Sequence, residues 1–290
     1  MNFALAKTGM STRAAEPTHA LHGFCTKLID LEFRFPQHRM AVAFDLPGPT
    51  FRSLKLPSYK SGRPPMPGDL RSQIELIREA CGLFGLPSLS EPSYEGDDIL
   101  ATCATAAAKA GFASVTIVTG DKDMLQLVTP DDAPTRVAIW DDRAKRVMDG
   151  EAVRAKFGVA PHQIADYLAL TGDASDAVPG VPGVGPKGAA QLLAAHGDLD
   201  AVLAAAASMK KSKRREALLD HAEQARRSRM LVELCRDVPL DPALATGLPM
   251  SFKSDELERF LKRWELNQVA GKVRKLRKAQ EQMEAGGGGA

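Results

Sequence analysis

The sequence predicts an α/β protein with a central, mostly parallel sheet flanked by helices, followed by a helical C-terminal region. Two short apolar runs, Met40–Phe44 and Val115–Val118, have the length and composition of buried strands. They alternate with helical patterns in the first part of the chain, which favours parallel strands with helices on both faces of the sheet. From Pro161 onwards the apolar period is helical. The predicted regions are therefore 1–160, 161–280 and a disordered, glycine-rich tail at 281–290.

The elements follow in chain order from their apolar periods and breakers. A basic segment between the first predicted strand and Pro67 contains several prolines, so a loop or mobile element is expected there. Two short strands, 137–140 and 146–148, are expected to pair with each other. The expected helices are 24–31, 69–84, 98–110, 124–127, 163–170, 187–196, 199–206, 214–234 and 255–280.

Composition excludes some classes of protein. The 290 residues carry a formal net charge of only +2, so a nucleic-acid partner would have to be recognised by local basic clusters. The four cysteines are scattered, which is typical of free thiols in a reducing compartment. No apolar run approaches the roughly 20 residues of a membrane span, and the N-terminus has no long apolar signal region. An intracellular protein without a membrane partner is expected.

The stretch Thr171–Ala190 combines two features that suit phosphate chemistry. Asp173 and Asp176 place two carboxylates three residues apart. Gly183-Val-Gly185 then predicts a tight hairpin that opens a helix at Pro186-Lys187-Gly188. Free backbone N–H groups and the helix dipole favour an anion such as a phosphate at that point.

Further carboxylates lie where the fold would bring them to the same edge of the sheet. Asp45 and Asp121 follow the two predicted strands, and Asp123 comes two residues later. Glu95 and Asp98 share a face at the start of a helix. The candidate metal ligands are Asp45, Glu95, Asp97, Asp98, Asp121, Asp123, Asp173 and Asp176. So many carboxylates need counter-ions, and two magnesium or manganese ions about 3.5–4 Å apart could activate water against a phosphodiester.

Each feature also has a plainer interpretation. Any one of the acidic residues at positions 95–98 could simply stabilise the N-terminus of a helix and have no other role. Gly183-Val-Gly185 could be an ordinary turn between helices. Asp121-Lys-Asp123 also occurs in phosphomonoester hydrolases that use an aspartyl phosphate, so Asp121 as nucleophile is a third possibility. It leaves the hairpin, Asp173 and Asp176 unexplained. The combination of four acidic segments with the hairpin favours a nuclease.

Several motifs, in this order along the chain, resemble those of the 5′-nuclease family, specifically the 5′→3′ exonuclease domain of bacterial DNA polymerase I and its stand-alone and plant-organelle relatives. The resemblance covers residues 13–268. It is carried by Ala41–Asp45, Gly48–Arg52, Tyr59-Lys60, Arg63–Pro67, Tyr94–Asp98, Val118–Asp123, Asp166–Leu170 and Gly172–Gly188.

The resemblance implies a PIN-like catalytic domain, a helix-hairpin-helix, and cleavage of DNA with 5′ flaps or 5′ ends by a monomer. One metal would be held by some combination of Asp45, Glu95, Asp97, Asp98 and Asp121, and a second by Asp123, Asp173 and Asp176. The hairpin residues Gly183, Gly185, Lys187 and Gly188 would bind the duplex backbone, with a potassium ion on the carbonyls. Lys60 and Arg63 would steer the scissile phosphate, assisted by Arg52, and the ring of Tyr59 could stack on a displaced base. The bacterial cytoplasm or nucleoid, or a DNA-containing organelle such as a plastid, is the expected compartment.

Two departures from the family pattern affect this expectation. The family's first metal-binding Asp, in a Val-Asp-Gly motif on an opening strand, precedes the point where this sequence begins. A hydrophobic slot and impaired catalysis are therefore expected. Ala177 stands where relatives commonly carry Asn. The alternative hypothesis is a protein of the same fold that binds DNA structures but cuts poorly.

Overall fold

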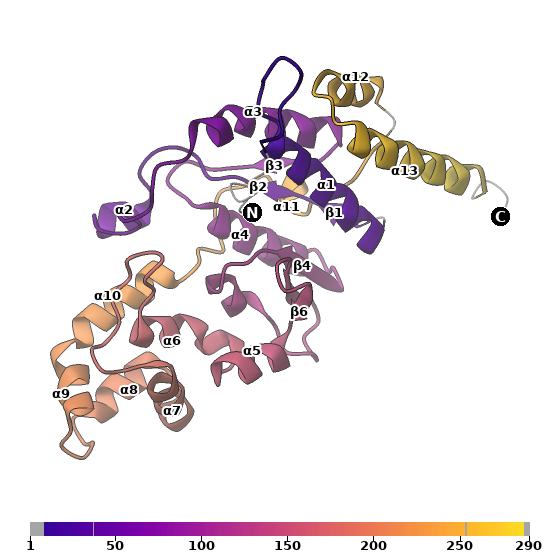
Figure 1. Ribbon diagram of the computed structural model, residues 1–290. Helices are drawn as coiled ribbons and strands as arrows, with labels where there is room; N and C mark the ends of the chain where they lie inside the picture. The colour runs from indigo at the N-terminus through magenta and orange to yellow at the C-terminus, as the bar shows by residue number, and fades with distance from the viewer. Residues whose placement is uncertain (1–8, 37, 253, 287–290) are drawn as a thin grey trace. The chain divides into compact units, whose positions relative to one another are not determined.

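The computed structural model of the protein describes residues 9–36, 38–252 and 254–286 (Figure 1). The chain forms two compact units, each built from separate stretches of sequence. Among the described residues, unit 1 comprises 9–43, 65–89 and 241–286, and unit 2 comprises 44–64 and 90–240. This division differs from the predicted boundary at residue 160, because the C-terminal helices pack against an N-terminal helix within unit 1.

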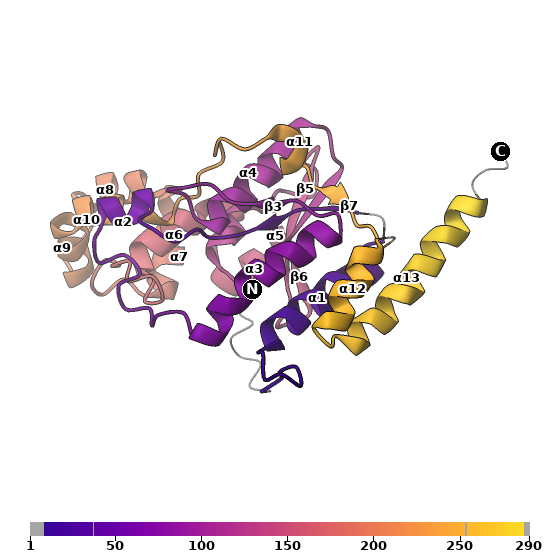
Figure 2. The same cartoon turned by 90° about the horizontal axis from the view of Figure 1, so that it is seen from above.

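Unit 1 is mainly helical, and its longest helices pack around one another. Its elements are α1 (His19–Arg34), β1 (Arg39–Met40), β2 (Val42–Ala43), α3 (Gly68–Leu83), β3 (Ser88–Leu89), α11 (Pro242–Ala245), β7 (Leu248–Pro249), α12 (Asp255–Arg263) and α13 (Asn267–Gly286). Figure 2 shows α1, α12 and α13 side by side. The side-chain carbonyl of Gln73 on α3 accepts from the backbone N–H groups of Ala20 and Leu21, at 2.9 and 3.1 Å. Gln73 thereby satisfies amides that the first turn of α1 leaves unpaired.

The predicted strand Met40–Phe44 is divided between two short ladders. β1 pairs antiparallel with β7, and β2 pairs parallel with β3. The strand changes partner at Ala41, so neither ladder extends beyond two residues. Its residues are half-buried, whereas a buried strand was predicted here.

Unit 2 contains the longest ladder among the described strands. Its first elements are α2 (Phe51–Lys55), α4 (Gly96–Lys109), β4 (Ser114–Val118), the 3₁₀ helix η2 (Asp123–Leu127), β5 (Arg136–Asp141), β6 (Arg146–Met148), α5 (Gly150–Phe157) and the 3₁₀ helix η3 (Pro161–Gln163). β4 pairs parallel with β5, and β5 pairs antiparallel with β6, which confirms the predicted pair of short strands. The described strands form three small sheets, where one central sheet was expected.

The second half of unit 2 is helical, as predicted. It consists of α6 (Ile164–Thr171), α7 (Pro186–His196), α8 (Leu199–Ala206), α9 (Lys213–Asp220) and α10 (Ala222–Val232), which lie together in Figure 1. α10 packs on α6, and Ser228 donates to the carbonyl of Pro179 at 2.8 Å. The loop after α6 crosses itself so closely that a Cβ on Gly180 would lie 2.4 Å from the carbonyl carbon of Thr171. Glycine is therefore required at Gly180, and the loop that carries Asp173 and Asp176 is held firmly.

Three expectations concern the ends of the chain and its helices. α13 continues through residues 281–286, where a disordered tail was predicted, and residues 287–290 lie outside the described part. The expected loss of an opening strand concerns sequence before residue 9, which also lies outside it. No helix in the described ranges is long and apolar enough to cross a bilayer.

Candidate functional site

Carboxylates from separate segments gather within unit 2. Asp45 accepts from the backbone N–H of Gly96, at the start of α4, at 2.7 Å. Asp97, on the first turn of α4, interacts electrostatically with Asp121, Asp45 and Glu95. Asp123, at the start of η2, interacts in the same way with Asp121, Asp173, Asp176 and Asp97. The structure therefore brings seven of the eight candidate ligands to one region: Asp45, Glu95, Asp97, Asp121, Asp123, Asp173 and Asp176.

Asp98 is the candidate ligand that does not face this region. Its carboxylate is fully buried and accepts four hydrogen bonds. Two come from the guanidinium of Arg52, at 2.6 and 2.7 Å, and two come from the backbone N–H groups of Glu95 and Cys235, at 3.1 and 2.9 Å. These bonds use the full acceptor capacity of a carboxylate. Asp98 therefore has no lone pair to offer a metal, and its place in the ligand set is withdrawn.

Arg52 and Tyr59 do not form part of a DNA-contacting surface. Arg52 is 1% exposed to solvent, and Tyr59 is 7% exposed. The phenol of Tyr59 donates to Glu95 Oε2 at 3.0 Å, so its ring lies under the carboxylates. The prediction that these two residues contact DNA was wrong. Sequence shows a basic, proline-rich segment but does not show which of its side chains turn inward.

Three basic side chains lie against the gathered carboxylates. Lys60 Nζ donates to Glu95 Oε1 at 2.8 Å and lies 3.7 Å from Asp176 Oδ2. Arg63 donates to Asp176 Oδ1. Lys122 Nζ lies 3.0 Å from Asp173 Oδ1. The role of Lys122 was missed in the sequence, where the only signal is its place between Asp121 and Asp123.

These basic groups do not neutralise the whole cluster. Burial, with the carboxylate of Asp121 nearby, raises the pKa of Asp97 to about 7 and that of Asp123 to about 8. Asp123 Oδ1 is buried and has no hydrogen-bond partner. Burial opposes the ionisation of Asp173 as well, but hydrogen bonds from Ser175 and Lys122 outweigh it and lower the pKa of Asp173. The region around Asp97 and Asp123 therefore holds more negative than positive charge.

The donor set fits a hard divalent cation, although the side chains as they stand do not form a complete metal site. All the candidate ligands are carboxylates, the oxygen donors that such cations prefer. Among the described residues, no group of three or more His, Cys, Asp or Glu side chains is arranged to hold a metal ion. The ion pairs of Lys60, Arg63 and Lys122 explain this, because they engage Glu95, Asp176 and Asp173. A cation would have to displace some of these pairs.

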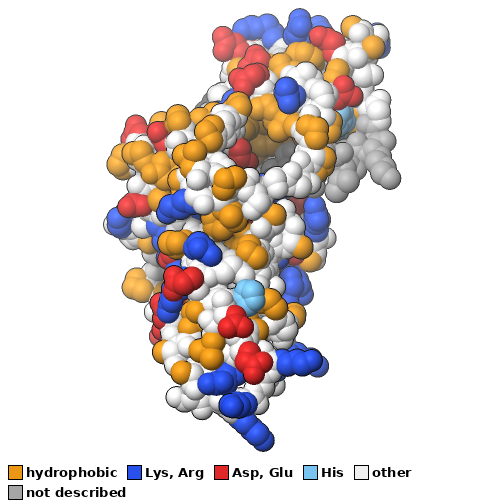
Figure 3. Space-filling model, turned by 90° about the vertical axis from the view of Figure 1, so that its left-hand side faces the viewer, with side chains coloured by type: hydrophobic (Ala, Val, Ile, Leu, Met, Phe, Trp, Pro, Cys, Tyr) orange, Lys and Arg blue, Asp and Glu red, His pale blue; other side chains and the backbone are white. Residues whose placement is uncertain are grey.

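The predicted hairpin is exposed on unit 2. Gly183 has φ +75°, Gly185 is the residue before α7, and Pro186 is the first residue of the helix, as expected. A Cβ at Gly183 or Gly185 would meet no atom within 4 Å, so the backbone is open to a ligand. The side chain of Lys187 is exposed beside it. Lys and Arg side chains gather at the lower end of Figure 3, where α7, α8 and α9 lie.

Two backbone positions near the carboxylates have positive φ without being glycine. Ala177, between Asp176 and the buried Val178, has φ +56°, and Lys60 has φ +55°. Left-handed backbone is unfavourable for alanine, and asparagine tolerates it better. Asparagine would therefore fit the backbone conformation at position 177 better than the alanine that is present.

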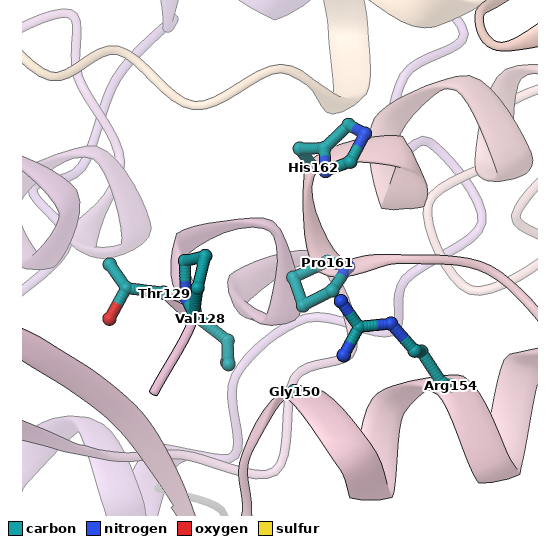
Figure 4. Close-up of a pocket in the computed structure, with 7 residues that line it drawn as sticks. Val128, Thr129, Gly150, Arg154, Pro161 and His162 are labelled. Carbon is teal, nitrogen blue, oxygen red and sulfur yellow. The ribbon is translucent and has the colours of Figure 1, made fainter. Parts of the chain in front are cut away.

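A small pocket in unit 2 contains none of the predicted site residues. It has a volume of about 70 Å³. Figure 4 shows the guanidinium of Arg154 reaching toward Pro161, with the ring of His162 on another side. Its lining is Val128, Thr129, Pro130, Gly150, Arg154, Pro161 and His162.

Comparison with known proteins identifies relatives of most of the chain. Residues 2–158 match the family described as 5′-3′ exonuclease, N-terminal resolvase-like domain, and residues 159–256 match 5′-3′ exonuclease, C-terminal SAM fold. DNA polymerase I of Rhizobium leguminosarum is 40% identical over 264 residues, which cover 89% of this chain and 25% of that protein. The chain spans about a quarter to a third of the length of the curated relatives it matches.

Solved structures share the fold. A phage T5 5′-exonuclease with bound divalent metal ions (zinc) aligns with a TM-score of 0.62 and 20% identity, covering 86% of this chain and 90% of that one. A phage T5 flap endonuclease, in a pseudo-enzyme–product complex with DNA and metal ions, aligns with a TM-score of 0.63 and 19% identity, covering 86% of this chain and 91% of that one. These similarities confirm the predicted fold class.

The raised pKa of Asp123 predicts a pH-dependent cost to stability. As pH rises from about 4 to about 8, the unfolded chain releases the Asp123 proton while the folded chain retains it, so stability falls across this window. Asp123→Asn removes that titration. In EDTA at pH 8 we expect the variant to melt higher than the parent, by about 2–4 °C for each kcal/mol recovered. The difference should shrink towards pH 4, as measured by thermal denaturation.

Asp132→Asn, at an exposed turn of the same unit, is the matched control and should leave the melting temperature unchanged at every pH. A difference between Asp123→Asn and the parent that does not vary with pH would contradict the assigned environment of Asp123.

Proposed function

The chain belongs to the 5′-3′ exonuclease family, and we propose that it is a divalent-metal-dependent nuclease that hydrolyses phosphodiesters at the 5′ ends and 5′ flaps of DNA. The observation that carries this proposal is the cluster of carboxylates around Asp97 and Asp123, which is short of positive charge. The partner is DNA, bound by a monomer inside the cell. The bacterial cytoplasm or nucleoid, or an organelle such as a plastid, is the proposed compartment.

The proposed ligands divide into two groups by their place in the chain. Asp45, Glu95, Asp97 and Asp121 would hold one magnesium or manganese ion. Asp123, Asp173 and Asp176 would hold a second. Two such ions in a nuclease activate a water and stabilise the leaving oxygen of the phosphodiester. The zinc named for the phage T5 5′-exonuclease supports the general class of divalent cation.

The basic side chains have a second task in this proposal. Lys60 and Arg63 are paired with Glu95 and Asp176, and Lys60 is only partly buried. When a cation takes these carboxylates, both side chains become available to a phosphate, which Arg can bind through two parallel hydrogen bonds. Tyr59 stays in place and continues to donate to Glu95.

The hairpin is the proposed grip on the duplex. The backbone amides of the exposed Gly183 and Gly185 and of the half-buried Gly188 would face backbone phosphates, with Lys187 beside them, and the turn carbonyls could accept a potassium ion. Phosphate contacts of this kind carry no sequence information, which suits recognition of DNA structure. The alternative, a protein that binds DNA without cutting it, shares this surface and is separated by assay.

Cleavage of a 5′-flap duplex tests the proposal. The protein with magnesium should release the flap, and EDTA should abolish cleavage. Asp121→Asn should lower the cleavage rate by at least about a hundredfold while leaving DNA affinity in EDTA unchanged, because Asp121 is proposed to hold metal and not DNA. Tight, salt-sensitive binding without any cleavage would favour the alternative, and normal cleavage by Asp121→Asn would refute the ligand assignment.

Lys60 is expected to compete with the divalent cation for Glu95. Lys60→Met should therefore bind manganese about threefold to tenfold more tightly than the parent, a difference of roughly 0.6–1.4 kcal/mol, while cutting more slowly. Isothermal titration calorimetry without DNA measures the affinity. Lys55→Met, which removes an exposed lysine five residues away whose ammonium lies over the Phe51 ring, is the control. Weaker manganese binding by Lys60→Met would exclude competition.

Lys187→Ala should weaken binding to a blunt duplex without affecting the carboxylates. Loss of one phosphate contact lowers the dependence of log affinity on log salt by about one unit. Fluorescence anisotropy over a salt series in EDTA checks this. Lys109→Ala, an exposed lysine at the end of α4, should leave the slope unchanged. An equal effect of both substitutions would mean that Lys187 acts only through net charge.

A further inference from the structure

A saturated hydrogen-bond network lies beneath the carboxylates and centres on Arg52. All five N–H groups of its guanidinium have acceptors. Nε donates to the carbonyl of Leu231 at 2.7 Å, and Nη2 donates to the carbonyl of Glu233 at 2.8 Å. The remaining donors reach Asp98 at 2.6 and 2.7 Å and Glu95 Oε2 at 3.2 Å. Arg52 therefore ties α2, α4 and the end of α10 together within unit 2.

Only one member of this network also faces the gathered carboxylates. Asp98 is turned inward and has no acceptor capacity left. Glu95 accepts from Arg52 and Tyr59 through Oε2 and from Lys60 through Oε1. Arg52 and Tyr59 thus fix one oxygen of Glu95 from the buried side of the cluster. The other oxygen is held only by the partly exposed Lys60.

Arg52 carries a permanent positive charge inside this network. An arginine guanidinium stays protonated in proteins, and the carboxylates of Asp98 and Glu95 lie 2.6 and 3.2 Å from its Nη1. The Phe51 ring lies 4.5 Å from the guanidinium and limits its movement further. A fixed, fully bonded cation can orient a carboxylate more precisely than a mobile surface lysine can.

We infer that Arg52 is a positioning residue that holds the Glu95 carboxylate with one oxygen presented to a divalent cation, and that Arg52 itself touches neither metal nor DNA. This inference rests on the proposed function, because it takes Glu95 as a metal ligand. It assigns to a buried arginine of the basic segment a task different from that of Lys60 and Arg63.

The test replaces the planar fork and keeps the charge. Lysine has a single ammonium that cannot reproduce five fixed donors, so Arg52→Lys should bind manganese about tenfold to a hundredfold more weakly. Affinity for a 5′-flap duplex in EDTA should stay within about twofold of the parent. Arg229→Lys is the control, because Arg229 Nε forms a 2.8 Å ion pair with Asp166 that joins α10 to α6 in the same unit. It should leave manganese affinity unchanged.

A double-mutant cycle shows whether Arg52 acts through Glu95. In a Glu95→Gln background, Arg52→Lys should cause little further loss of manganese affinity, because the carboxylate it orients is already absent. A purely structural role would instead give the same loss in both backgrounds. Asp98→Asn is a nearly isosteric change that weakens the hydrogen bonds to Arg52, so it should also lower manganese affinity. This variant replaces Arg52→Lys in the test if circular dichroism shows that Arg52→Lys does not fold.

The possible results separate the inference from the proposed function. If the parent binds no manganese, the proposed function fails, and the inference fails with it. If the parent binds manganese and Arg52→Lys and Asp98→Asn bind it equally well, only the inference about Arg52 is overturned. Equal losses with Arg52→Lys and Arg229→Lys would also overturn it.

Discussion

Repulsion between crowded carboxylates is the constraint on which unit 2 depends. Several acidic side chains meet in a partly buried region, where like charges are costly. The chain offsets part of that cost with Lys60, Arg63 and Lys122 on the open side and with Arg52 below. The remainder is visible at Asp123, which has a raised pKa and an unpaired oxygen. The site therefore keeps an excess of negative charge that its basic neighbours do not offset.

The elements with long, regular patterns could be predicted from sequence. The helical second half, the paired strands after residue 136 and the glycine hairpin follow from apolar period and turn chemistry, and the structure contains them. The strand at Met40–Phe44 was harder, because apolar composition does not reveal that a strand changes partner midway. The helix α13 also extends beyond the expected start of the tail, because residues 281–285 are helix formers and the run of glycines begins only at Gly286.

The sequence predicted which residue types form the candidate site, but it did not predict in which direction each side chain points. Acidic residues after strands and at a helix start predicted which segments converge. Sequence could not separate Asp98 from Asp97, because neighbouring residues on one helical turn differ by about 100° in direction and only packing decides which turns inward. The same ambiguity explains Arg52 and Lys60, both basic residues of one segment. The first is sealed in the interior, and the second is partly exposed.

The main chain of Lys60 shows how this site can respond quickly. Its backbone N–H donates to the carbonyl of Asp176 at 3.0 Å, so the main chain is anchored, while the four-carbon side chain is partly exposed and is held at its end by Glu95. Under the proposed function, a change of partner from the carboxylate to a phosphate would need only rotamer transitions of this side chain and no slower refolding of the loop. The length of the side chain would then set how far from Glu95 its ammonium could bind a phosphate.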